Sequence, residues 1–130
     1  MADKERFLDG RGKGEFSYDY KNDILFFKIK DREYQKSLDF QDIVVDIDKE
    51  GFATGIQIFD VSKMFNIDKT TLNNIKNWQF QIKIEDNIVT MQFMFAMLRR
   101  NKEVERGENL VREADSQLKD AEVLCTIPTK

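Results

Sequence analysis

Apolar side chains recur at every second position over two long neighbouring stretches of this 130-residue chain. Residues 78–84 alternate tryptophan, phenylalanine and isoleucine with glutamine and lysine, and residues 89–97 carry valine, methionine and phenylalanine at the odd positions. A period of two is that of a β-strand with one buried face, because successive side chains point to opposite faces. The turn residues Glu85-Asp86-Asn87 lie between the two stretches. The alternation therefore predicts a long antiparallel hairpin.

The same period extends over much of the remaining chain. Five shorter runs show it: residues 16–20, 25–29, 43–47, 52–58 and 121–127. Asp60 and Asp68 are expected to cap two short helices over 61–65 and 69–75, since an aspartate carboxylate accepts hydrogen bonds from a first helical turn. The sequence predicts a mainly β fold, namely an antiparallel sandwich or rolled sheet of about seven or eight strands with one to three short helices.

Two charged segments depart from this pattern. Residues 1–14 end in three glycines at alternate positions, which predicts a flexible arm before a single β-rich domain over 15–130. A glycine loop that cradles phosphate follows a strand and opens a helix, whereas this one precedes a strand pattern. Residues 99–120 are also highly charged, and we expect residues 109–119 within them to form either a short helix or a mobile loop.

The scarce residue types exclude several chemistries. The chain has no histidine and one cysteine, which excludes nucleophile–histidine catalysis, an intramolecular disulfide and a cysteine-rich zinc site. Its net charge of −3 gives no general attraction to nucleic acid or to an anionic membrane. The charged start of the chain is not a signal peptide, and no apolar stretch reaches the ~20 residues of a membrane span. We therefore expect a cytoplasmic protein.

Several residues in the first half of the chain occur in an order that is shared with a known family. They are Tyr18-Asp19, Asp23, Leu25, Phe26, Val45, Asp46, Asp48, Gly51, Gly55-Ile56-Gln57-Ile58 and Val61-Ser62. In this order they resemble the small β-rich domain of unknown function numbered 2283, over residues 16–66. That family usually has glutamate at the position of Gln57 and alanine at the position of Val61. The resemblance implies no activity, but some bacterial members look like the antitoxin half of toxin–antitoxin pairs, which implies a protein-binding role.

Acidic residues near position 48 match the opening of a calcium-binding loop, from Asp46 to Gly51. Such a loop needs a bidentate carboxylate at its twelfth position, which here is the neutral amide of Gln57. We favour an acidic hairpin turn with outward carboxylates, with no metal ion and no cofactor. The alternative is a small acid-dependent hydrolase using Asp46 and Asp48, which requires both carboxylates in one concave pocket.

A group of aromatic residues near the N-terminus allows another alternative. The group is Phe16, Tyr18, Tyr20, Phe26 and Phe27. Aromatic side chains stack on the bases of single-stranded nucleic acid when a basic groove lies beside them. Here Lys28 and Arg32 are interleaved with Asp23 and Asp31. Aromatic residues at a period of two are more typical of a sheet core, so nucleic-acid binding is the less favoured interpretation.

The outer face of the strand predicted at 89–98 changes character along its length. It begins with Thr90 and Gln92 and continues with Met94, Ala96 and Leu98. A strand that is apolar on both faces must be covered on both. A partner protein, a second copy of the chain or the folded-back segment 109–119 would provide that cover. We expect this face to be the contact surface of a non-enzymatic protein-binding module or homo-oligomer subunit.

Overall fold

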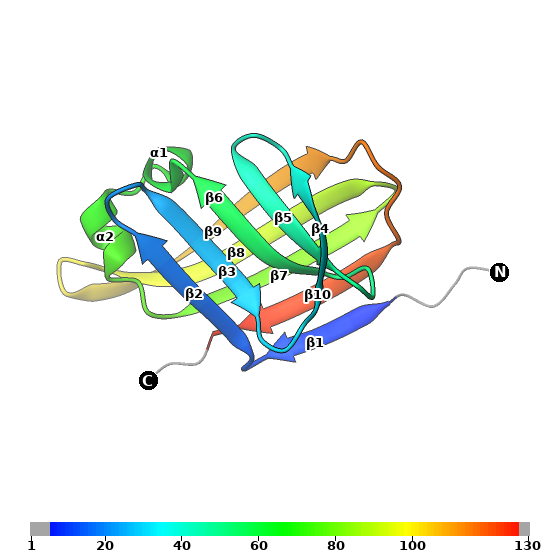
Figure 1. Cartoon of the computed structure of the whole chain (residues 1–130). Coiled ribbons are helices and arrows are strands. Elements are labelled where there is room, and N and C mark those ends of the chain that lie inside the picture. The colour runs from blue at the N-terminus through cyan, green and yellow to red at the C-terminus, as the bar shows by residue number, and fades with distance from the viewer. Residues whose placement is uncertain (1–5, 128–130) are drawn as a thin grey trace.

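Two five-stranded sheets pack face to face in the computed structural model, which describes residues 6–127 (Figure 1). Sheet A has the order β1 (Phe7–Arg11), β10 (Ala121–Thr126), β7 (Trp78–Glu85), β8 (Ile88–Arg99), β9 (Lys102–Glu113). Sheet B has the order β2 (Gly14–Asp19), β3 (Ile24–Ile29), β6 (Ala53–Phe59), β5 (Ile43–Asp48), β4 (Tyr34–Asp39). Neighbouring strands run antiparallel, except that β1 is parallel to β10. The predicted mainly β, sandwich-like fold is confirmed, and the described residues form more strands than expected.

The apolar positions of the alternating runs meet between the two sheets. Phe27 of β3 lies at the centre, with its ring centroid 5.0 Å from that of Trp78, 5.2 Å from Phe80 and 5.6 Å from Phe93. All four side chains are buried. Since the last three belong to sheet A, the core joins strands from both halves of the chain.

Residues 6–14 do not form the flexible arm expected from their glycines. Residues 7–11 form β1, which pairs with β10. A Cβ on Gly14 would lie 2.5 Å from the Sγ of Cys125, so this glycine allows two strands to pack closely. Gly12 has a φ of 79° in the turn between β1 and β2, where the freedom of glycine is used. Residues 1–5 of the predicted arm lie outside the described residues.

The segment 109–119 is neither a helix nor a mobile loop over its first half. Residues 109–113 belong to β9, whose twelve residues pair in regular register with β8. Arg100 and Asn101 have φ values of 52° and 66°, as the two-residue type I′ turn of a hairpin requires. A short helix is marginal without tertiary packing, whereas the hairpin gives each residue of this segment a partner across the ladder.

Two short helices, α1 (Val61–Phe65) and α2 (Lys69–Asn73), follow β6. The cap predicted for α2 is confirmed, because the Asp68 carboxylate accepts hydrogen bonds from the N–H and the hydroxyl of Thr71 at 3.3 and 2.6 Å. The cap predicted for α1 is wrong, because Asp60 has a φ of 53° and its side chain makes no cap bond. Neither helix in the described part of the chain is long and apolar enough to cross a membrane.

Candidate functional site

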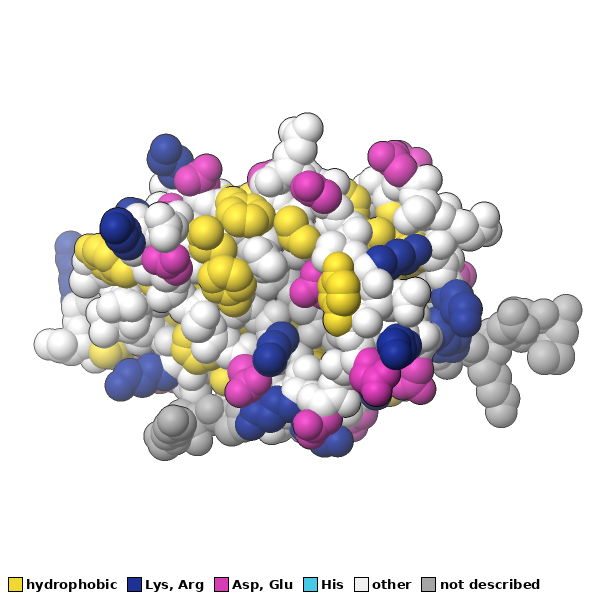
Figure 2. Space-filling model, viewed as in Figure 1, with side chains coloured by type: hydrophobic (Ala, Val, Ile, Leu, Met, Phe, Trp, Pro, Cys, Tyr) yellow, Lys and Arg dark blue, Asp and Glu magenta, His cyan; other side chains and the backbone are white. Residues whose placement is uncertain are grey.

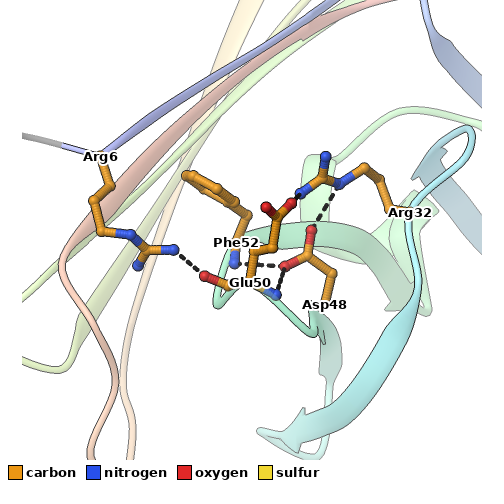
Figure 3. A network of polar contacts seen from close by, with 5 residues as sticks. All are labelled: Arg6, Arg32, Asp48, Glu50 and Phe52. Carbon is orange, nitrogen blue, oxygen red and sulfur yellow. Dashed lines mark hydrogen bonds and ion pairs between the residues drawn. The ribbon is translucent and has the colours of Figure 1, made fainter.

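Asp48, at the end of β5, is the centre of a buried polar network (Figure 3). One carboxylate oxygen accepts the N–H groups of Glu50 and Phe52, each at 2.9 Å, and the other accepts Arg32 Nε at 2.8 Å. These three donors occupy both oxygens and close the turn between β5 and β6. The Asp48 side chain is 1% exposed, so the prediction that this carboxylate points outward is wrong.

Two arginines hold the same turn from its sides. Arg32 also pairs with the Glu50 carboxylate, and Arg6 donates to the Glu50 carbonyl oxygen. Both guanidinium groups lie over the Phe52 ring, with the Cζ of Arg6 4.5 Å and that of Arg32 5.7 Å from its centroid. Burial alone would lower the pKa of Arg32, but its bonds to Asp48 and Glu50 outweigh burial and raise that pKa. The network is a structural clamp between the turn and the start of sheet A.

Asp46 lies two residues earlier, on the outer face of sheet B. A row of facing residues crosses all five strands there: Glu15, Lys28, Gly55, Asp46 and Ser37. Gly55 has no side chain, so the row is open in its middle, and a Cβ at this position would lie 3.0 Å from Asp46 Oδ2. Two hollows of about 420 and 450 Å³ adjoin here. Figure 2 shows this face, with hydrophobic side chains gathered over β3, β6 and β5.

The two candidate acids, Asp46 and Asp48, have different hydrogen-bond partners. Ser37 Oγ donates to Asp46 Oδ1 at 2.8 Å and lies 2.8 Å from the Tyr34 hydroxyl oxygen. Asp46 lines both hollows. Asp48 faces the arginine clamp and lines neither hollow. The geometry therefore does not bring Asp46 and Asp48 into the single pocket that the hydrolase hypothesis requires.

Cys125, the single cysteine of the chain, is buried and protonated. Burial raises the pKa of the Cys125 thiol to about 12, so it is protonated at neutral pH and a poor nucleophile. Within residues 6–127, no three His, Cys, Asp or Glu side chains are grouped so that they could hold a metal ion.

Asp23 carries a buried carboxylate. The sequence predicts a turn at this residue but no buried role for it. It accepts hydrogen bonds from the Tyr18 hydroxyl at 2.8 Å and from the N–H and hydroxyl of Ser62 at 3.1 and 2.6 Å. Asp23 thus takes the capping place expected of Asp60 and ties the β2–β3 turn to α1. Burial, and then the bond to Asp23, raises the pKa of Tyr18.

The N-terminal aromatic residues do not share one surface. Phe27 is buried, and Phe16 and Tyr18 are half-buried against the core. Phe26 is half-buried on the opposite face of sheet B, and Tyr20 is 49% exposed. This distribution matches the sheet-core interpretation of the group.

The outer face of the β8–β9 hairpin carries the apolar row that the sequence singles out. Met94 is 47% exposed and Leu98 is 72% exposed, with Ala96 half-buried between them. β7 begins at Trp78, which lies opposite Phe95 of β8. Residues 96–99 of β8 therefore pair with β9 and not with β7. The row therefore continues onto a hairpin end that projects past its neighbouring strand.

Acidic residues accompany this apolar row. In the register of the hairpin, Ala96 lies opposite Glu105 and Leu98 lies opposite Glu103. The segment 109–119 does not fold back over the row, because residues 109–113 are part of β9 itself. An apolar row thus lies directly beside an acidic one.

Comparisons with known proteins locate these features within a family. A family model described as "Protein of unknown function (DUF2283)" matches residues 15–62. The uncharacterized protein MJ0789 of Methanocaldococcus jannaschii is 35% identical over 114 residues, which span 86% of this chain and 97% of that protein. The chain belongs to the DUF2283 family. A Methanosarcina mazei protein named putative hypoxanthine phosphoribosyltransferase is 31% identical over 93 residues, or 72% of this chain and 76% of that protein. No solved structure matches the chain.

The DUF2283 match confirms the resemblance predicted for residues 16–66. The matched segment contains the strands of sheet B, and with them Asp48 and the hollow over Gly55. The hairpin face at 94–98 lies outside the matched segment. The names of the two relatives share no activity.

Proposed function

We propose that the protein is a non-enzymatic protein-binding module whose docking surface is the outer face of the β8–β9 hairpin. The observation that carries this proposal is the concentration of exposed apolar side chains on one hairpin. Of the large hydrophobic residues that are exposed in the described part of the chain, the outer face of the hairpin holds Met94, Leu98 and Val111. Val104 lies on the inner face opposite Met97, and Phe7, Tyr20 and Tyr34 lie on other elements. Exposed apolar residues gathered on one element and rimmed by charge are typical of interaction sites.

The charges beside the row indicate the chemistry of the partner. Glu105 and Glu103 lie on the same face as Ala96 and Leu98, directly across the hairpin. A partner segment with apolar side chains along one line and lysine or arginine beside them would bury the row and pair with both carboxylates. We therefore propose a basic amphipathic segment of another protein as the occupant.

Replacing Leu98 with asparagine is expected to weaken the binding of a basic amphipathic peptide at least about tenfold. The reason is that burial of one leucine side chain contributes about 1.5–3 kcal/mol, and 1.4 kcal/mol is a factor of ten in affinity. The probe is a fluorescein-labelled synthetic helix with leucine on one face and lysine beside it, titrated with the full chain and followed by fluorescence anisotropy.

Phe7→Asn is the matched control, because Phe7 is 51% exposed at the other edge of sheet A. This variant is expected to bind the peptide like the unmodified chain. Equal binding by the Leu98→Asn variant, or equal binding of a peptide with glutamate in place of lysine, would contradict the proposed docking surface.

A further inference from the structure

The free edge of sheet A is a second surface of the hairpin, and it offers backbone groups in place of apolar side chains. β9 is the last strand of sheet A and is paired with β8 on one side. Strands at the edge of a sheet are commonly short or bulged, which discourages pairing with another chain. β9 has twelve residues, and its register with β8 has no shift. Its far side is therefore a long, regular template for another strand.

The hairpin turn determines which backbone groups point to this free edge. The residues that flank the two-residue turn Arg100-Asn101 form a hydrogen-bonded pair, and such pairs recur at every second residue of an antiparallel ladder. The even-numbered residues of β9 therefore bond to β8. The Ala114 N–H continues this series by donating to the Asn87 carbonyl oxygen at 2.8 Å. The odd-numbered residues from 103 to 111 consequently point outward.

A second copy of β9, running antiparallel, fits this edge best in one register. When the two-fold axis passes through Gly107, Arg106 lies opposite Glu108 of the second copy, and the pair occurs twice. Both residues are even-numbered, so they occupy the non-hydrogen-bonded positions, where facing side chains are closest. An axis at Arg106 would set this arginine against its own copy, and an axis at Glu108 would do the same to the glutamate. Charge therefore favours the axis at Gly107.

The neighbouring positions agree with the same register. Val104, which is 38% exposed, would lie opposite Leu110 of the second copy, so that two apolar side chains meet. The like-charged pair in this register is Lys102 opposite Arg112 at the two ends of the strand. Arg112 is already bonded to Asp42 at 2.9 Å in its own chain, which offsets its charge.

We propose that two copies of the chain pair through β9 about a two-fold axis at Gly107, so that their A sheets become one continuous sheet. This pairing uses the strand edge and is independent of the peptide-binding face. Because the axis is perpendicular to the sheet, the apolar rows of both copies lie on the same side of the joined sheet. Gly107 lies opposite Met94, so the two methionines would flank the two glycines at the centre of that side.

The test is a mixing experiment with the charge-reversed variants R106E and E108R, followed by sedimentation velocity. Each variant alone sets like charges against one another in the proposed register, and its dimer dissociation constant is expected to rise at least tenfold. In an equal mixture every reversed charge meets an opposite charge on the other variant. A heterodimer is therefore expected to form with an affinity near that of the unmodified dimer.

The mixture separates contact between chains from effects within a chain. Within one chain, Arg106 forms an ion pair with Glu108 at 2.9 Å and also donates to the Phe65 carbonyl oxygen. R106E lacks both contacts and E108R lacks the ion pair, and this holds whether the variants are alone or mixed. K83E and E85K are matched controls, because Lys83 and Glu85 have the same spacing on the central strand β7; both are expected to dimerise normally. A chain that is monomeric at all concentrations, or variants that dimerise as well alone as in the mixture, would overturn the proposal. Neither outcome affects the Leu98 peptide test.

Discussion

Replacing Asp48 with alanine is expected to lower the free energy of unfolding by about 3 kcal/mol or more. The change leaves the Arg32 guanidinium without its buried partner, and removal of one member of a buried ion pair costs about 3–5 kcal/mol. It also leaves the N–H groups of Glu50 and Phe52 unbonded at about 1–3 kcal/mol each. Arg32 keeps 21% of its side chain exposed and keeps its ion pair with Glu50, so the expected loss lies below the sum of these terms. Urea unfolding followed by circular dichroism measures the loss.

Asp46→Ala is the matched control for this variant, because it removes the same side chain two residues away on the same strand. The Asp46 carboxylate is partly exposed and holds the Ser37 hydroxyl, so its loss is expected to cost about 1 kcal/mol. Equal destabilisation by the two variants would contradict the assignment of Asp48 as the structural clamp.

Replacing Phe27 with alanine is expected to cost about 3–5 kcal/mol, the usual range for removal of a buried phenylalanine. Its ring contacts Trp78, Phe80 and Phe93 across the interface between the sheets, so the cavity would open where both halves of the chain meet. Phe26→Ala removes the same side chain one residue earlier, from the half-buried outer face, and is expected to cost clearly less. The difference in unfolding midpoint between the two variants, measured in urea, checks which face of β3 carries the core. Equal unfolding midpoints for the two variants would contradict the assignment of Phe27 to the core face of β3.

The sequence predicted the six strands that are paired on both sides, and one edge strand, β2, whose apolar side chains alternate. The alternation in residues 78–97 fixes the face of each side chain, and Phe80 of β7 indeed lies opposite Phe93 of β8. The strands it missed are β1, β4 and β9, and all three lie at sheet edges. An edge strand pairs on one side and carries charged residues, so its composition resembles that of a loop. For β9 the helical spacing of a few apolar residues pointed to the wrong element.

The candidate acids show a different limit of sequence reasoning. Counting by twos places Asp46 and Asp48 on the same face of β5, and Ile43, Val45 and Ile47 do share the core face as this count predicts. Asp48 departs from the count because it ends the strand, where its carboxylate accepts the N–H groups of Glu50 and Phe52 in the following turn. Met94, Ala96 and Leu98 share the outer face, as the alternation predicts, because the register of β8 is uninterrupted there.

Amide hydrogen exchange of β9, resolved by residue, decides whether two copies pair through this edge. The N–H groups of the even-numbered residues bond to β8 and are expected to be protected at every protein concentration. The N–H groups of Glu103, Glu105, Gly107, Asn109 and Val111 point outward, and we expect their exchange to slow as the concentration rises above the dissociation constant of the dimer. Exchange of these five groups at one fast rate, unchanged from dilute to concentrated protein, would contradict the pairing.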